Sequence, residues 1–290
     1  MRKLLFPSLK RRGGAKRRGG QPGRNVVAEL TTPSAPRCAR CIHPSFSRRG
    51  KIAILSLAVV LSFSTVLAHA QAPPTAKAAS PSDFTGYWVS VVTEDWLYRM
   101  VTPARGDYAS VPINPEGRKV ADAWDPAKDE AEGNQCKAYG APAITRIPGR
   151  LHITWQDDNT LKIETDAGRQ TRLLHFRGSP AGQGGDWQGV SMAEWEVVAG
   201  ARGPIPGGGM KVVTTKMKPG YLRKNGVPYS ANAVVTEYVD RVNESNGDSW
   251  LIVKTIVDDP QYLTQPFITS THFKKQNDAT GWNPTACSAP

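Results

Sequence analysis

The sequence predicts an all-β fold in which an antiparallel meander closes into a barrel. Nine segments alternate apolar and polar residues with a period of two, which is the pattern of a strand with one buried face. The same segments are rich in β-branched and aromatic residues, which strands favour. No helices alternate with these segments, so a barrel or sandwich is favoured over a parallel α/β fold.

The expected strands begin at residue 86. They cover residues 86–93, 150–156, 160–165, 170–176, 191–198, 210–217, 233–242, 249–257 and 266–274. Short clusters of turn-forming residues at 157–159, 166–168 and 246–248 join neighbouring segments. Because such turns connect adjacent antiparallel strands, we expect a meander, and we expect its two edges to meet.

One segment between the first two strands breaks the alternation. Pro115 stands where a helix can begin. The amide hydrogen at the first helical position makes no hydrogen bond within the helix, so proline, which lacks that hydrogen, is tolerated there. Helical spacing then continues to Trp124, and Pro126 interrupts it. We predict one short helix near residues 115–132, which could resume after Pro126. This helix would cover one end of the barrel.

The net charge of +12 comes from the N-terminal part of the chain. Residues 1–70 hold 14 basic residues and a single acidic one, Glu29, which leaves 23 basic and 24 acidic residues in the remainder. A near-neutral body lacks the basic surface that phosphate backbones require. We therefore expect no nucleic-acid partner.

Residues 48–70 have the pattern of a secretory signal peptide. An uncharged apolar run over 52–70 follows Arg48, Arg49 and Lys51 and ends in the small-residue triplet 68–70. We expect cleavage near residue 70 or 72, a periplasmic or secreted location, and no stable membrane anchor afterwards. An uncleaved anchor and twin-arginine export are the alternatives.

The remaining boundaries follow from composition. Residues 1–47 form a basic extension that cannot make a core and is expected to be disordered, unless the start codon is mis-called. Residues 71–83 are rich in Pro, Ala and Ser and are expected to form a flexible linker. Residues 84–290 are long enough for one sizeable core and are predicted to form a single barrel domain, of undetermined oligomeric state.

Two cysteines remain after cleavage, Cys136 and Cys287. In an oxidising compartment an even count favours one disulfide, which would close a loop of 152 residues. Such a loop contributes roughly 5 kcal/mol of stability in the chain-entropy model. A nucleophilic thiol is the alternative. The Cys38 and Cys41 pair lacks the further ligands of a zinc site, so we expect no metal and no cofactor.

Two patterns resemble known families. Residues 86–88 read Gly-Tyr-Trp at the start of the first strand, which resembles the G-x-W of lipocalins and other calycins. Residues 187–196, 211–215 and 259–266 are similar to a pattern W-x-G-x-S-x-x-x-W-E … L-V-V-x-T … D-P-x-Y found in uncharacterised exported bacterial proteins. The first resemblance implies a calycin-like barrel whose Trp packs across the closed end. The second implies export and supplies no catalytic residues.

Three residues are candidates for acid–base chemistry. The alternation places His175 with Leu173, and it places Glu237 with Val235 and Val239. If those apolar faces line the lumen, both side chains point inward, where a histidine beside a carboxylate suits general acid–base catalysis. His152, on another strand, is the third candidate. A structural histidine that only satisfies its hydrogen bonds is the competing interpretation.

Aromatic and basic segments suggest a ligand site. All eight Trp lie beyond residue 86, and Trp and Tyr are typical of apolar pockets with a few polar groups. Residues 94–99 (EDWLYR) follow the first strand, where they could line the mouth of a barrel or form an amphipathic strand rim. The basic residues within 211–224 could attract an anionic ligand, although a solvated strand face is the simpler interpretation. The residues expected to bind the ligand are Trp96, Tyr98, Arg99, Trp155 and Tyr238.

Two functions remain open after these observations. The first is an exported barrel that binds a small apolar or amphipathic molecule, and a filled barrel would count against it. The second is a barrel enzyme of the isomerase, cyclase or hydrolase type, which needs at least two acid–base groups within hydrogen-bond reach in one pocket. A structural envelope role is the third, weaker possibility.

Overall fold

The structure is a computed structural model that describes residues 73–200 and 203–288. The expected basic extension (1–47), the signal peptide (48–70) and the pair Cys38 and Cys41 lie outside the described residues. In the described part, no helix is long and apolar enough to span a bilayer.

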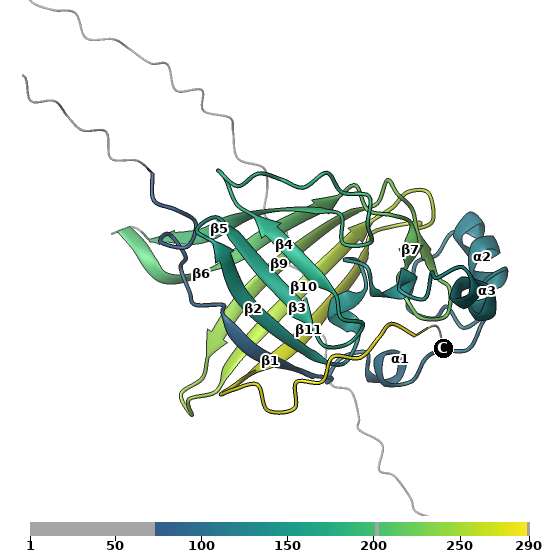
Figure 1. Ribbon diagram of the computed structural model, residues 1–290, viewed down its shortest axis with the longest axis horizontal. Coiled ribbons are helices and arrows are strands. Elements are labelled where there is room, and N and C mark those ends of the chain that lie inside the picture. The colour runs from purple at the N-terminus through teal and green to yellow at the C-terminus, as the bar shows by residue number, and fades with distance from the viewer. Residues whose placement is uncertain (1–72, 201–202, 289–290) are drawn as a thin grey trace, which may run out of the picture. The chain divides into compact units, whose positions relative to one another are not determined.

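Nine strands form a closed barrel (Figure 1). They are β1 (Gly86–Val91), β2 (Arg150–Asp157), β3 (Thr160–Thr165), β4 (Thr171–His175), β5 (Val190–Gly200), β6 (Gly203–Thr215), β9 (Val234–Asn243), β10 (Ser249–Asp258) and β11 (Phe267–Gln276). Each of the nine predicted segments overlaps one of these strands, and β6 begins earlier than expected. The order around the barrel is β1-β11-β10-β9-β6-β5-β4-β3-β2, and β2 returns to β1. The all-β barrel is therefore confirmed.

One strand pair corrects the expected antiparallel meander. β4 and β5 run parallel, with Leu174 opposite Ser191 and His175 opposite Met192. The reason is topological, because strands cannot alternate in direction all the way around a closed ring with an odd number of members. Residues 176–189 return along the barrel before β5 begins, which a short turn could not do.

The predicted helical segment is present in two pieces. Helix α2 (Pro115–Asp122) begins after Asn114, whose Oδ1 accepts a hydrogen bond from the Gly117 amide at 2.8 Å. Helix α3 (Pro126–Ala131) begins after Asp125, whose Oδ1 accepts from the Ala127 amide at 3.0 Å. Each piece thus has a proline at its first position and a side-chain N-cap.

Further short elements join these helices at one end of the barrel. They are helix α1 (Trp96–Met100), the 3₁₀ turns η1 (Lys137–Tyr139) and η2 (Ile144–Arg146), and the hairpin of β7 (Gly220–Tyr221) and β8 (Pro228–Tyr229). Figure 1 shows α1, α2, α3 and β7 at the right of the barrel, and we call this the helical end. Residues 94–99, for which a barrel mouth or an amphipathic strand rim was expected, lie at this end of the barrel, and Trp96–Met100 form helix α1 rather than a strand.

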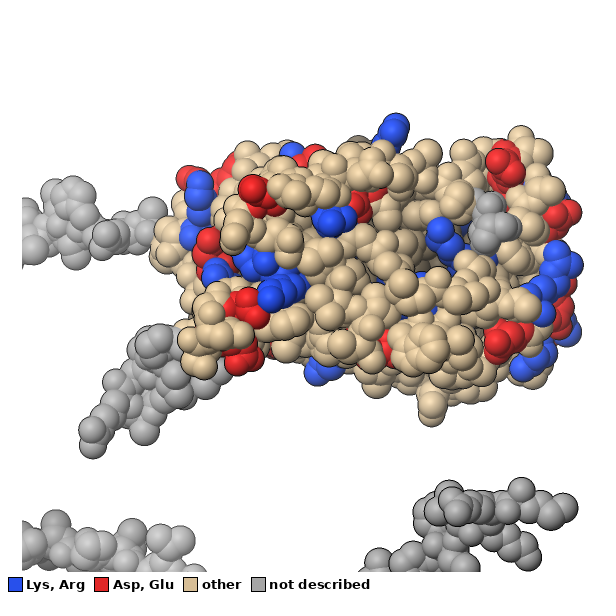
Figure 2. All heavy atoms as spheres, turned by 90° about the horizontal axis from the view of Figure 1, so that it is seen from below, with Lys and Arg blue, Asp and Glu red and all other residues tan. Residues whose placement is uncertain are grey.

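Two hydrophobic clusters hold these parts together. The first fills the barrel and includes Trp88, Leu161 and Phe273. The second joins the barrel strands to the helical end, through Leu222 and Tyr229 among others. Figure 2 shows Lys and Arg interspersed with Asp and Glu on the face that it presents, as expected for a near-neutral body.

The segment expected to be a flexible linker is docked at the other end of the barrel. The Ala76 amide donates to Asn159 Oδ1 at 2.9 Å, and Trp195 Nε1 donates to the Ala76 carbonyl at 2.9 Å. Ala76 is buried against the barrel core. The ordered domain therefore begins before residue 84, because the open end of the barrel offers apolar surface that this segment covers.

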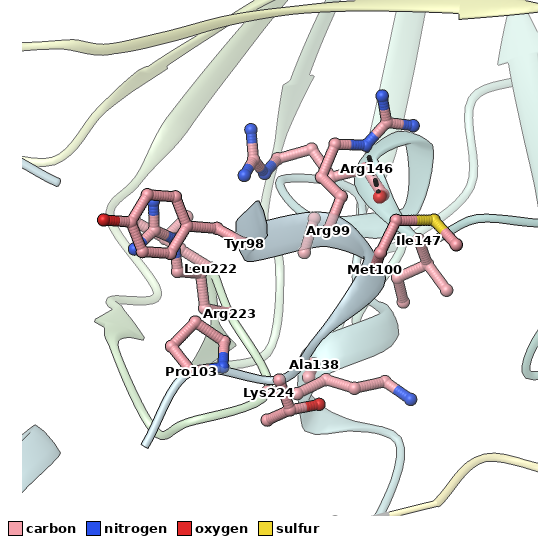
Figure 3. A pocket seen from close by; sticks show the side chains of 12 residues that line it. Tyr98, Arg99, Met100, Pro103, Ala138, Arg146, Ile147, Leu222, Arg223 and Lys224 are labelled. Atoms are coloured by element: carbon pink, nitrogen blue, oxygen red, sulfur yellow. Dashed lines mark hydrogen bonds between the residues drawn. The ribbon is translucent and has the colours of Figure 1, made fainter. Parts of the chain in front are cut away.

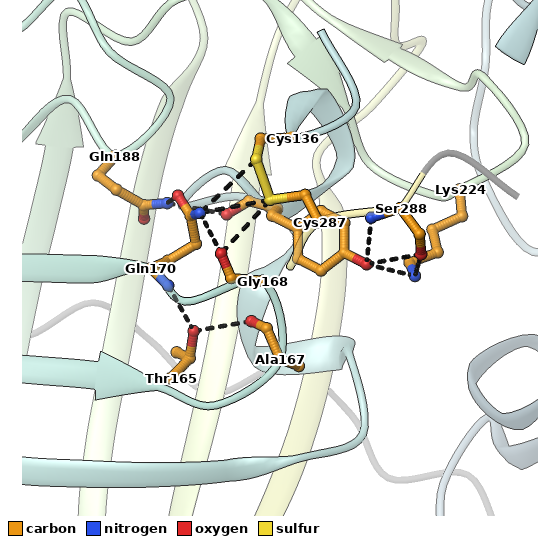
Figure 4. The surroundings of a disulfide bond; sticks show 10 residues. Cys136, Thr165, Ala167, Gly168, Gln170, Gln188, Lys224, Cys287 and Ser288 are labelled. Atoms are coloured by element: carbon orange, nitrogen blue, oxygen red, sulfur yellow. Dashed lines mark hydrogen bonds between the residues drawn. A yellow bond between two sulfur atoms is a disulfide. The ribbon is translucent and has the colours of Figure 1, made fainter. Parts of the chain in front are cut away.

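The expected disulfide between Cys136 and Cys287 is present, with the two Cα atoms 5.1 Å apart. It joins the C-terminal segment to the helical end, next to Gln170, whose Nε2 lies 3.5 Å from Cys287 Sγ (Figure 4). The Tyr139 hydroxyl accepts hydrogen bonds from the Ser288 amide at 3.2 Å and from Lys224 Nζ at 2.6 Å. The last residues are thus held by one covalent bond and several polar contacts.

Candidate functional site

The barrel lumen is almost completely filled by side chains. The cavity that remains there has a volume of about 30 Å³. That is room for about two water molecules, whereas sites for drug-sized ligands are about 300–1,000 Å³. Its walls are mostly apolar side chains such as Leu161, Met210 and Leu251. The lumen of this conformation therefore does not accommodate a small-molecule ligand.

A buried ion pair crosses the lumen. The Arg172 guanidinium donates to both Glu237 oxygens, at 2.7 Å and 3.2 Å. Arg172 Nη2 also lies 3.1 Å from Thr214 Oγ1 and 3.3 Å from Ser191 Oγ, and these two hydroxyls are 2.8 Å apart. Glu237 points inward as predicted. Its partner is an arginine rather than a histidine, so the charges are matched one to one.

His175 does not point into the lumen, and the expected orientation is wrong. Its neighbours Arg172 and Leu174 line the lumen cavity, so strand alternation turns His175 outward. There it is buried beneath the loop that follows β4, with Nδ1 3.0 Å from Ser179 Oγ. Burial lowers the pKa of His175. The prediction failed because a charged residue, Arg172, occupies an inward position.

His152 also faces outward. Its ring stacks on Tyr87 with centroids 4.1 Å apart, and Trp282 packs against it edge-on at 6.0 Å. Nδ1 lies 3.4 Å from a carboxylate oxygen of Glu164. The three candidate catalytic residues therefore occupy three different environments, and the structure does not bring His152, His175 and Glu237 together.

A cavity on which several basic groups converge lies at the helical end. A cavity of about 180 Å³ is lined by four basic residues, Arg99, Arg146, Arg223 and Lys224 (Figure 3). We call it the basic pocket. In Figure 3 the guanidinium groups of Arg99 and Arg146 lie above the cavity and Lys224 lies below it. Its apolar walls include Met100, Ile147 and Leu222.

Two carboxylates face these cations. Arg99 pairs with Glu94, and its Nε donates to the Arg146 carbonyl at 2.8 Å. Arg146 Nη2 lies 2.6 Å from Asp95 Oδ2, and Arg223 Nη2 lies 3.8 Å from the same oxygen. The pocket therefore has more positive than negative charge.

Burial makes this excess of positive charge energetically unfavourable. It lowers the pKa of Arg99 and of Arg223, and repulsion from Arg146 lowers both further, against the opposite effect of the nearby carboxylates. Arginine remains charged under such conditions. Arg223 Nε is buried without a hydrogen-bond partner. Three crowded guanidinium groups would be stabilised by an additional anion, because an anion offsets their mutual repulsion.

The residues predicted to bind a ligand are divided between several places. Tyr98 and Arg99 line the basic pocket. Trp96 lies on α1 with its ring exposed, and Trp155 packs against Phe176 and Trp195 at the other end of the barrel. Tyr238 lies under Lys254, whose Nζ is 4.3 Å from the ring centroid. Two of the five predicted residues therefore share the candidate site.

The sequence pointed to two of the pocket's walls and missed the third. Residues 94–99 and the basic run that ends in Arg223 and Lys224 are possible ligand contacts in the sequence, although a solvated strand face is the simpler interpretation of the basic run. Arg146 was missed, because a single arginine in an irregular segment carries no local signal. Only the fold brings these three segments together.

Comparisons of the chain with protein-family models, with curated proteins and with solved structures find no match. Among the residues that the structure describes, no group of three or more His, Cys, Asp or Glu is placed to hold a metal ion. What the fold and the pocket define is a class, a nine-stranded β-barrel with a filled lumen and a basic pocket at one end.

Proposed function

We propose that this protein is an exported binding protein for a small amphipathic anion, held in the basic pocket at the helical end. One observation carries the proposal: four basic side chains line a cavity that also has apolar walls, and the two carboxylates that pair with Arg99 and Arg146 do not line it. Guanidinium groups suit carboxylates and phosphates, whose oxygens accept charge-assisted hydrogen bonds. The apolar walls suit a short hydrocarbon part.

The volume of the pocket limits the ligand. About 180 Å³ is below the usual size of a drug-binding site, which is about 300–1,000 Å³. A charged head with part of a chain fits this space better than a large ring system. The filled lumen argues against a ligand enclosed by the strands, so the site lies at the barrel end.

Export and a calycin-like character are part of the proposal. The disulfide supports an oxidising compartment, since such bonds persist mainly outside the cytosol. Trp88 is fully buried in the barrel and Lys275 Nζ lies 4.7 Å from its ring centroid, and we include in the proposal that this Trp packs as the calycin resemblance implies. The parallel β4–β5 pair departs from a simple meander barrel.

Titration with octyl phosphate tests the proposal, with octanol and inorganic phosphate as partial ligands. We expect octyl phosphate to bind more tightly than either, because only it engages both the cations and the apolar wall. Lys224→Gln should weaken binding by about tenfold, the usual effect of losing one hydrogen bond to a charged group. Equal affinity for octanol and octyl phosphate would contradict the proposal.

A matched control is available on the same segment. Lys218 is exposed and lies 4.6 Å from the Trp187 ring centroid, and it does not line the basic pocket. Lys218→Gln removes the same charge from the protein as Lys224→Gln. Its affinity for octyl phosphate should equal that of the unchanged protein, which separates local contacts from a general effect of net charge.

One observation favours an enzyme as the second candidate. On the outer face of β11, Ser270 Oγ lies 3.4 Å from His272 Nε2, and His272 Nδ1 lies 3.2 Å from Glu94 Oε2. Ser270, Glu94 and Arg146 line a groove of about 250 Å³. A serine that contacts a histidine, which in turn contacts a carboxylate, is the arrangement of the catalytic triad of serine hydrolases.

In such a hydrolase, Ser270 Oγ would bond to the acyl carbon of an ester while its proton passes to His272 Nε2. The alkoxide would leave with that proton, and water would then release the acid. A fluorophosphonate probe tests this, since it should label the protein and fail to label Ser270→Ala. Absence of labelling in the unchanged protein would remove the enzyme candidate.

A further inference from the structure

Helix α1 presents an unusually apolar surface to solvent. Three residues of the helix and its C-cap residue are at least half exposed. They are Trp96 (61%), Leu97 (50%), Met100 (60%) and the C-cap Val101 (60%). We call these four the α1 patch. Helical spacing explains how they gather, because residues four apart lie on one face and the two pairs lie on adjacent faces. Between them, the Arg99 side chain turns back into the protein and is buried.

Such a surface indicates a partner. Single exposed apolar residues are normal, but four contiguous ones on a short helix indicate an interaction site. The residue types are informative as well, since Trp is enriched at the boundary between lipid and water. A helix of five residues can only lie in that boundary, on one side of a membrane.

The α1 patch continues into the basic pocket. Met100 belongs to both, and Figure 3 shows it beside Arg99 and Ile147 on the pocket wall. A ligand whose anionic head meets the cations therefore has an apolar path past Met100 to the patch. Glu94 and Asp95, the nearest carboxylates, are paired with Arg99 and Arg146. The arrangement is complementary to a surface that is anionic at its boundary and apolar beneath.

We propose that the α1 patch docks on an anionic lipid bilayer and that the anion in the basic pocket is a lipid headgroup. This rests on the proposed function and names its ligand class, a phospholipid. The four side chains of the patch enter the boundary between headgroups and acyl chains, as in peripheral proteins that bind through apolar side chains and charge together. Lys224 and the arginines then face the lipid phosphate.

Vesicle flotation tests the docking. The probes are vesicles of phosphatidylcholine alone and vesicles that also contain phosphatidylglycerol. We expect the protein to float with the anionic vesicles, to bind them less as salt rises, and to bind neutral vesicles weakly. Brominated acyl chains should quench the fluorescence of Trp96, and Trp96→Phe should lose most of that quenching.

A double variant separates the docking from the pocket. Neither Trp96 nor Val101 lines the basic pocket, so Trp96→Ser/Val101→Ser should keep its affinity for soluble octyl phosphate. Its binding to anionic vesicles should fall by at least about tenfold, because burying one such side chain is typically worth that factor or more. Val197→Ser is the matched control, since Val197 is 51% exposed on β5 and lies outside the patch.

The outcomes distinguish the two proposals. Binding of octyl phosphate without binding of anionic vesicles overturns the docking and leaves the proposed function standing. Vesicle binding that survives Trp96→Ser/Val101→Ser also overturns it. If neither octyl phosphate nor vesicles bind, both proposals fail. Loss of vesicle binding in the double variant, with octyl phosphate affinity kept, supports both.

Discussion

The lumen and the helical end both contain buried arginine, but they differ in how far nearby carboxylates balance its charge. In the lumen, Arg172 is bound through two hydrogen bonds to Glu237, and two hydroxyls complete the cluster. The space around it is about 30 Å³. At the helical end, three arginines and a lysine line a cavity of about 180 Å³, and the two carboxylates that pair with Arg99 and Arg146 do not line it.

The difference separates a structural use of charge from a functional one. A buried ion pair with matched charges and no free volume specifies packing and leaves nothing for a ligand. An excess of cations beside a cavity is stabilised when an anion arrives. The charged residue that best marks a site is therefore the one whose charge the protein itself does not balance.

Removing the carboxylate in the lumen is expected to have the largest effect. Glu237→Gln leaves the Arg172 charge buried and unpaired, which should lower the free energy of unfolding by about 3–5 kcal/mol. Denaturation in urea measures it. The double variant Arg172→Met/Glu237→Leu should recover most of the loss. A cost below about 1 kcal/mol for Glu237→Gln would mean that the pair is not buried as described.

Breaking the disulfide is expected to have the next largest effect. Cys287→Ser should lower the free energy of unfolding by about 2–5 kcal/mol, since the bond closes a loop of 152 residues. The protein under reducing and non-reducing conditions should show the same difference, and Cys287→Ser should show none. Because the bond lies at the helical end, we also expect weaker binding of octyl phosphate, with the lumen pair unaffected.

Removing a carboxylate at the helical end should lower the stability slightly and should strengthen the binding of octyl phosphate. Asp95 is only partly buried and has φ of 50°, a conformation that Asn tolerates. Asp95→Asn should cost about 1 kcal/mol of stability. It should tighten octyl phosphate binding, because one fewer negative charge opposes the anion. Weaker binding would contradict the charge argument.

A pH dependence is the smallest expected effect. Burial lowers the pKa of His175 below its ordinary value of 6.5. The unfolded chain therefore binds this proton first as pH falls, so the contribution to stability is present above about pH 6.5 and is lost as pH falls through the lowered pKa. His175→Gln should flatten the pH dependence in that window. An NMR titration with a normal pKa for His175 would contradict its burial.

The strands could be predicted from the sequence because local alternation is a strong signal. Each of the nine segments overlaps a strand, and Pro115 marks the start of α2 as predicted. Pro126, interpreted as an interruption, is instead the first residue of α3. The parallel pair also follows from the sequence once the strands are counted, since nine strands in a closed ring require at least one. The expectation of a fully antiparallel meander did not take this rule into account.

The orientation of β4 could not be predicted. Leu173 and Leu174 occupy opposite faces, so either face could be the inner one, and only Glu237 across the lumen makes Arg172 acceptable inside. The basic pocket had the same difficulty. Arg99, Arg146 and Arg223 come from segments far apart in the chain, and no spacing rule relates them.

The most direct test of the account is a crystal structure of the protein bound to octyl phosphate. The account predicts the phosphate within hydrogen-bond distance of Lys224 and of at least one of Arg146 and Arg223, with the alkyl chain along Met100, and a lumen that is unchanged. Octyl phosphate inside an expanded barrel, beside Arg172 and Glu237, would contradict it.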